Sequence, residues 1–216
     1  MTRISFYYDP SCPWCWITSR WLTEVQTARD IEIEWLPFSL ALKNGELGGE
    51  DVTGHLDTHT IAHRTLRLIE AVHTNEGIDR GELFTQFGTA YFIDPKLGDD
   101  DFIPAVLERM NLPATYLGEL DNADRDQVLQ QHLDEAGEVA GGDDVGVPLL
   151  VFETEDEQRL AYFGPVIRRL PTPERGLELW DSILTLATDP DFFELKRDGR
   201  RRSKVKTTKR LFPELS

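Results

Sequence analysis

Two cysteines, the only ones in this chain, stand in the run Cys12-Pro13-Trp14-Cys15. The run lies where a predicted strand, Ile4 to Tyr8, gives way to a predicted helix, Cys15 to Arg29. Pro13 suits the first turn of that helix, because its φ is already helical and its missing N–H has no acceptor there. The fold must therefore bring the end of a strand and the start of a helix together around a dithiol.

That position predicts a reactive pair of thiols. Unsatisfied backbone N–H groups and the positive end of the helix macrodipole favour an anion at a helix start, so Cys12 should ionise more readily than a free cysteine. Cys15 lies one turn further in and should be less exposed. It can attack a mixed disulfide formed on Cys12, release the bound thiol and close a disulfide. We therefore predict Cys12 as the nucleophile and Cys15 as the resolving thiol.

Two other interpretations of the cysteines stay open at this point. The pair can be structural, or it can be half of a zinc site. A zinc site would have to recruit His55, His59 and His63, which recur at four-residue spacing and would share one face of a helix. These histidines are far from the dithiol in sequence and no second CxxC exists, so we expect no metal.

The run from Tyr7 to Trp16 resembles the active-site segment of the DsbA-like branch of the thioredoxin superfamily. A second landmark, Gly146-Val147-Pro148 before the apolar run Leu149 to Phe152, is similar to the segment that carries the cis-proline of that superfamily. The resemblance implies that this loop packs against the dithiol. It also implies that the backbone of Val147 pairs with an extended substrate beside Pro148.

Between these landmarks the chain is mostly predicted to be helical, because apolar residues recur at helical spacing. The stripes lie within residues 56–72, 83–91, 102–110 and 128–136. This matches the architecture that the DsbA-like resemblance implies. We therefore predict an α/β protein with a DsbA-like thioredoxin fold whose core is split by a large α-helical insertion.

The remaining core elements also follow from residue patterns. Ile31 to Trp35 alternates apolar and acidic residues, which is typical of a strand with one wet face. Leu149 to Phe152 and Leu160 to Phe163 are predicted to form a hairpin, and a helix capped by Thr172 is predicted to follow. We expect a thioredoxin-fold N-terminal part at 1–42, the insertion at 43–137, a thioredoxin-fold C-terminal part at 138–190 and a basic tail at 191–216.

Composition fits one globular unit that needs no disulfide for stability, because 216 residues can bury roughly 70% of the surface of the unfolded chain. The formal charge of −16 argues against general nucleic-acid binding. The basic tail, from Lys196 to Arg210, can bind an acidic surface, RNA or a second subunit, or it can be a flexible segment neutralised by the acidic body. A homodimer stays open.

The start of the chain leaves no room for an apolar signal region before the dithiol, and no long apolar stretch follows. We therefore expect a cytoplasmic protein that does not bind membranes. Thiols are kept reduced in that compartment, so the dithiol should act as a reductant and not as a maker of structural disulfides.

Among cytoplasmic DsbA-like proteins, the chain is most similar to the actinobacterial family described as mycothiol-dependent nitroreductases. The likeness is carried by the CPWC run, by the segments 36–40 and 42–44, by the helical stretch and by Gly146-Val147-Pro148. It implies an oxidoreductase that takes electrons from mycothiol, a low-molecular-weight thiol, and passes them through the dithiol to a disulfide or nitro acceptor. No bound cofactor is expected, because nothing resembles a flavin or dinucleotide fingerprint.

Several residues around the dithiol are candidates for contact with a substrate. Pro13 and Trp14 lie within the CPWC run, and the Trp14 indole offers a flat face on which an aromatic acceptor can stack. Asn44 can hydrogen-bond a polar ligand, or it can be a turn residue before Gly45. Asp9 is expected to shape the turn before the dithiol.

Two rival functions share the predicted architecture. The first is a cofactor-free thiol transferase or isomerase that resembles kappa-class glutathione transferases and chromene-carboxylate isomerases. Those active sites carry a serine and need no resolving thiol, so the presence of Cys15 argues against them. The second is a non-catalytic binding module in which the dithiol has no redox role.

Overall fold

A four-stranded sheet forms the centre of the computed structural model, which describes residues 1–49, 54–94, 102–142, 144–154, 156, 158–197 and 203–204. The strands are β1 (Thr2–Tyr8), β2 (Ile31–Pro37), β3 (Leu149–Glu153) and β4 (Arg159–Phe163), in the order β2-β1-β3-β4. β1 runs parallel to β2 and antiparallel to β3, and β3 runs antiparallel to β4. This strand order, with a parallel crossover followed by a hairpin, is that of the thioredoxin fold.

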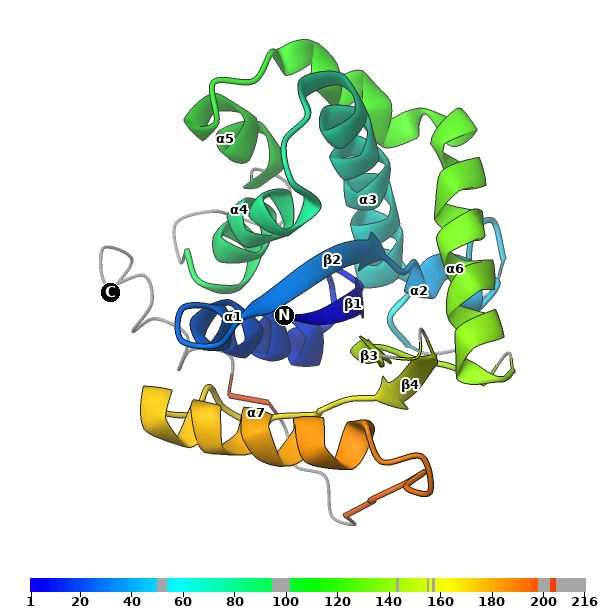
Figure 1. Ribbon diagram of the computed structural model, residues 1–216. Helices are drawn as coiled ribbons and strands as arrows, with labels where there is room; N and C mark the ends of the chain where they lie inside the picture. The colour runs from blue at the N-terminus through cyan, green and yellow to red at the C-terminus, as the bar shows by residue number, and fades with distance from the viewer. Residues whose placement is uncertain are drawn as a thin grey trace.

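Helix α1 (Pro13–Gln26) connects β1 to β2, and α7 (Pro173–Ala187) follows β4. The two helices pack together through Trp21 of α1. Its indole N–H donates to the Gly176 carbonyl of α7 at 2.9 Å, and its ring lies 6.0 Å from that of Trp180. Figure 1 shows α7 along one side of the sheet and the other helices above and beside it. The predicted elements of the core are thus confirmed.

The end of α1 differs from the prediction, which placed it at Arg29. The helix ends at Gln26, and the Thr27 hydroxyl donates to the Glu24 carbonyl at 2.7 Å. The chain must turn at once to enter β2 at Ile31. Apolar spacing could not reveal that short turn.

All four predicted helical stripes lie in the helical layer inserted between β2 and β3. Its helices are α2 (Leu40–Lys43), α3 (Leu56–Glu76), α4 (Arg80–Phe92), α5 (Phe102–Arg109) and α6 (Asp126–Ala140). Two 3-10 segments, η1 (Ala114–Asp121) and η2 (Ala123–Arg125), lead into α6. These 3-10 segments and the short α2 were not predicted.

Aromatic rings join α4 to the core beside the dithiol. Phe84 packs on Tyr8 at the end of β1, with ring centroids 4.2 Å apart. Gly88 lies against the buried Trp16 ring so closely that an added Cβ would come within 2.4 Å of it. The helical layer therefore lies directly over the turn that carries the cysteines.

One face of the β1–β2 pair is polar. On β2, Glu32 and Glu34 are exposed and bind Arg3 and Ser5 of β1 at 3.1 and 2.9 Å. These pairs explain why β2 alternates apolar and acidic residues. In the part of the chain that is described, no helix has the length and hydrophobicity needed to cross a membrane.

The basic tail falls largely outside the described residues. Lys204 is one of the described residues of the tail, and its backbone N–H donates to the Arg168 carbonyl at 2.7 Å. The proposed roles of the tail stay predictions.

Candidate functional site

The two cysteines lie where β1 passes into α1, as the sequence predicts. Cys12 is the N-cap residue of α1 with an extended backbone, and Pro13 occupies the first helical turn. The Cys12 sulfur accepts the Cys15 backbone N–H at 3.4 Å, which is how an N-cap side chain satisfies a free donor of the first turn. Both are free cysteines. Cys12 is 7% exposed and Cys15 is 0% exposed, so an incoming molecule meets Cys12 first.

The electrostatic environment separates the two thiols. Hydrogen bonds from the side chain and then the backbone of Cys15 lower the pKa of Cys12, against an opposing effect of burial. Burial raises the pKa of Cys15, and the adjacent Cys12 sulfur raises it further. Of the two sulfurs, Cys12 is therefore the one that ionises more readily.

The second predicted landmark meets the dithiol in space. The Val147-Pro148 peptide bond is cis, and the Val147 carbonyl oxygen lies 3.8 Å from the Cys12 sulfur. The Pro148 carbonyl accepts the Gly164 N–H at 2.7 Å, which ties this loop to the end of β4. The loop that the DsbA-like resemblance implies therefore lies beside Cys12, although contact with a substrate stays a prediction.

A buried carboxylate next to the dithiol is the main feature that the sequence interpretation underestimated. Asp9 is 0% exposed, and its carboxylate accepts the Ser11 N–H at 2.8 Å and the Leu40 N–H at 2.9 Å. Burial raises the pKa of Asp9, while these hydrogen bonds and the nearby His59 oppose the rise. The Asp9 charge in turn raises the pKa of Cys12 and of Cys15. Asp9 does shape the turn as expected, but it also sets the charge of the site.

The other predicted contact residues occupy less definite positions. Trp14 is partly buried and packs against the edge of the core. Asn44 is the C-cap residue of α2, its backbone N–H closes that helix, and Gly45 follows with a φ of 66°. This geometry fits a turn residue, and no described contact joins Asn44 to the cysteines, so ligand binding by Asn44 stays a prediction.

A shallow hollow opens where the dithiol turn meets the helical layer. Pro10 and Ser11 form one wall, and helices α3, α4 and α5 form the rest. Its rim is partly exposed, whereas its floor is buried and mainly apolar. The lining residues on the helices are Thr58, Ile61, Ala62, Thr65, Phe87, Tyr91 and Phe102. A flat apolar molecule would suit this surface better than a charged one.

The three histidines weighed as zinc ligands have other partners. His55 stands at the N-cap position of α3, with its ring 5.7 Å from that of His59. His59 lies 2.6 Å from Glu46, and His63 lies between Ser39 and Asp126. Within the described ranges, no group of three or more potential ligands is arranged to hold a metal ion. The histidine spacing is explained by these separate contacts.

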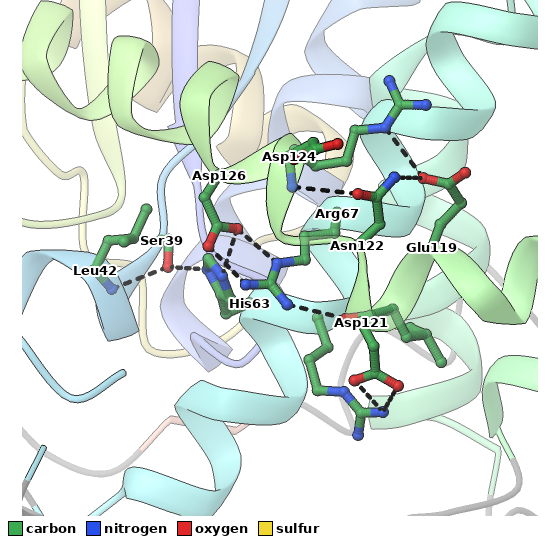
Figure 2. Close-up of polar contacts among 12 residues, drawn as sticks. Ser39, Leu42, His63, Arg67, Glu119, Asp121, Asn122, Asp124 and Asp126 are labelled. Atoms are coloured by element: carbon green, nitrogen blue, oxygen red, sulfur yellow. Dashed lines mark hydrogen bonds and ion pairs between the residues drawn. The ribbon is translucent and has the colours of Figure 1, made fainter. Parts of the chain in front are cut away.

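Figure 2 shows that Ser39, His63 and Asp126 form a serine–histidine–aspartate chain. Such a chain can activate a nucleophile, but the Ser39 side chain is 0% exposed and its oxygen already accepts the Leu42 N–H at 3.1 Å. Ser39 therefore acts as a helix cap and not as a nucleophile.

Comparisons with known proteins agree with this geometry. A family model described as Rv2466c-like, mycothiol-dependent nitroreductase Rv2466c, matches residues 11–197. The uncharacterized protein Rv2286c of Mycobacterium tuberculosis is 27% identical over 212 residues, which cover 91% of this chain and 82% of that protein.

Two solved structures support the fold. The cytosolic disulfide reductase DsbM from Pseudomonas aeruginosa superposes with a TM-score of 0.54 at 13% identity, covering 86% of this chain and 100% of DsbM. The probable DsbA oxidoreductase SCO1869 from Streptomyces coelicolor gives 0.53 at 16% identity, covering 94% and 98%. At these identities the likeness shows a DsbA-like thioredoxin fold.

Proposed function

This chain belongs to the mycothiol-dependent nitroreductase family, and from that premise we propose that it reduces nitro compounds or disulfides with electrons from mycothiol, through Cys12 and Cys15. As a member of that family it is a thiol oxidoreductase with a DsbA-like fold. We propose mycothiol as the thiol and a nitro compound or disulfide as the acceptor. We also propose that the CPWC dithiol carries the electrons and that the protein works in the reducing cytoplasm.

The observation that carries the proposal is the asymmetry of the two sulfurs. Cys12 is the more exposed, has the lowered pKa and accepts the Cys15 N–H, whereas Cys15 is enclosed and has a raised pKa. An attacking thiol and a resolving thiol need this difference, because the first must be an accessible anion and the second must stay protonated until the mixed disulfide forms.

The cycle balances with two molecules of thiol for each acceptor. In the reducing half, the dithiol gives two electrons and two protons to a nitro compound, which becomes a nitroso compound and water, and Cys12 and Cys15 become a disulfide. In the regenerating half, one mycothiol thiolate attacks Cys12 and Cys15 leaves as a thiolate. A second mycothiol then attacks the mixed disulfide, releases the oxidised thiol dimer and restores Cys12.

We propose that the acceptor binds in the hollow beside Ser11 and that Trp14, Val147, Pro148 and Asn44 complete the substrate surface. The hollow supports this because its apolar floor adjoins the residue before Cys12. We also propose the division into core parts 1–42 and 138–190, an insertion at 43–137 and a tail at 191–216.

Serine variants test the dithiol mechanism. Cys12→Ser should abolish reduction of a nitroaromatic compound in the presence of mycothiol. Cys15→Ser, incubated with the oxidised mycothiol dimer, should keep one mycothiol on Cys12 by thiol–disulfide exchange and release the other as a thiolate, visible as a mass increase that a reductant reverses. Glutathione and free cysteine in place of mycothiol identify the donor. Full activity of Cys12→Ser would exclude the mechanism.

The same variants separate the rival functions. A thiol transferase or isomerase has no need of a resolving thiol, so Cys15→Ser would keep multiple turnovers in that case. A binding module would show no turnover in the parent protein. Only the proposed cycle requires both cysteines.

A further inference from the structure

His63, on α3, is the middle residue of a hydrogen-bonded chain that runs from Asp126 of α6 to Ser39 at the start of α2 (Figure 2). Its Nε2 atom lies 3.0 Å from Oδ1 of Asp126, and its Nδ1 atom lies 2.9 Å from Oγ of Ser39. Ser39 and His63 are 0% and 1% exposed, so the contact between them is enclosed, whereas Asp126 is partly exposed. Both contacts join segments far apart in the sequence.

The protonation pattern of this chain is determined by its neighbours. Burial acts to raise the pKa of Asp126, but hydrogen bonds from Arg67 help to lower it overall. Two of these bonds are 2.6 Å long. An ionised carboxylate only accepts, so Nε2 of His63 carries the hydrogen. Burial also lowers the pKa of His63 and favours its neutral form. Nδ1 is then an acceptor for the Ser39 hydroxyl.

The Ser39 hydroxyl is thereby fixed in one orientation. It donates to Nδ1 of His63 and accepts the Leu42 N–H at 3.1 Å, which makes Ser39 the N-cap of α2. Because the Ser39 hydroxyl hydrogen points at Nδ1, the lone pairs of the Ser39 oxygen are directed at the helix. This orientation is the one that a capping residue needs.

The start of α2 touches the dithiol turn directly. The N–H of Leu40, the next residue after Ser39, donates to Oδ2 of Asp9 at 2.9 Å. The other oxygen of Asp9 accepts the N–H of Ser11, the residue before Cys12. A series of short contacts therefore leads from His63 to the carboxylate whose charge raises the pKa of both cysteines.

We propose that His63 is a positioning residue of the dithiol site, because by fixing Ser39 it holds the first turn of α2 against the Asp9 carboxylate. The Leu40 hydrogen bond then stabilises the charged form of that carboxylate against the effect of burial. The relevance to catalysis rests on the proposed redox function, but the contact itself can be measured without any substrate.

Two substitutions of His63 separate the two ends of its ring. His63→Asn places an amide oxygen near the position of Nδ1 and can still accept the Ser39 hydroxyl. His63→Gln places its amide near the position of Nε2, so it can still donate to Asp126 but offers Ser39 no acceptor. Both variants remove the buried ring, so their losses of stability should be similar.

The readout is the titration of the Asp9 carboxyl, followed by NMR in the full chain with both cysteines reduced. We expect the pKa of Asp9 to be higher in His63→Gln than in the parent by at least about half a unit, because a hydrogen bond to the charged form is weakened. His63→Asn should titrate like the parent. Ser39→Ala removes the link itself and should reproduce the shift of His63→Gln.

Equal Asp9 titration in the parent, His63→Gln and Ser39→Ala would overturn the proposal. An equal shift in His63→Asn and His63→Gln would also overturn it, because the effect would then come from lost packing. If His63→Gln does not fold, Ser39→Ala alone decides the result. A parent protein without reductase activity would refute the proposed function and leave this titration unaffected.

Discussion

Removal of the Cys15 side chain should raise the pKa of Cys12. In the structure, the first cause of the lowered Cys12 pKa is the hydrogen bond from the Cys15 side chain, and the Cys15 backbone N–H, 3.4 Å from the Cys12 sulfur, adds to it. Cys15→Ala deletes the first donor and keeps the second. Cys15→Ser keeps a hydroxyl donor at the same position and is the matched control.

The size of the effect follows from the type of bond. A hydrogen bond to a charged group contributes about 1.5–3 kcal/mol, and an S–H is a weak donor, so the lower end applies. Since one pKa unit corresponds to about 1.4 kcal/mol, Cys15→Ala should raise the Cys12 pKa by roughly one unit.

The assay is the rate of alkylation of Cys12 as a function of pH, followed by intact mass. In Cys15→Ala the midpoint of the rate profile should move to higher pH, and in Cys15→Ser it should stay near that of the parent, because the hydroxyl still donates. An unchanged midpoint in Cys15→Ala would show that the backbone alone stabilises the thiolate. The inner thiol would then have no part in the activation of Cys12.

Two further changes test the surroundings of the dithiol. Asp9→Asn should lower the pKa of Cys12 by roughly half to one unit, because it removes a buried negative charge that raises it, and the same alkylation profile measures this. A rise would contradict the electrostatic argument, and Asp57→Asn, at an exposed position on α3, is the control. Ala62→Leu, which fills the floor of the hollow, should raise KM for a nitroaromatic acceptor about tenfold or more and leave reduction of hydroxyethyl disulfide nearly unchanged. Equal loss with both substrates would show that the acceptor binds elsewhere.

The fold was predictable from the sequence because its strongest signals are local. A proline between two cysteines at a strand end predicted the start of α1, and regular apolar spacing predicted α3, α4, α5 and α6. The family likeness added the split thioredoxin fold and the cis-proline loop, neither of which can be derived from periodicity alone.

The surroundings of the dithiol were harder to predict because they depend on distant partners. Asp9 appeared to be a turn residue, and nothing in its neighbourhood of the sequence indicates a bond to Leu40. His63 appeared to belong to a regular row of histidines, yet its partners come from the start of α2 and from α6. Such contacts exist only once the helical layer packs on the core.

The irregular segments were missed for a different reason. The 3-10 segment η1 has one buried residue, Tyr116, so it presents no apolar period to detect. The cis bond between Gly164 and Pro165 was also not predicted, because a glycine before a proline in a loop gives no signal of the isomer. The Pro165 carbonyl nevertheless accepts the Thr18 hydroxyl of α1 at 2.8 Å.

The Cys12 sulfur is surrounded mainly by main-chain polar groups. The Cys15 N–H lies 3.4 Å from it, the Val147 carbonyl lies 3.8 Å from it, and the neighbouring carboxylate is held by the Leu40 and Ser11 amides. Every residue type except proline supplies an amide hydrogen, so positions 11 and 40 can diverge without loss of the donor. The backbone conformation around the Cys12 sulfur is therefore what must be conserved. Distantly related sequences that share this conformation can keep the same chemical environment around that sulfur.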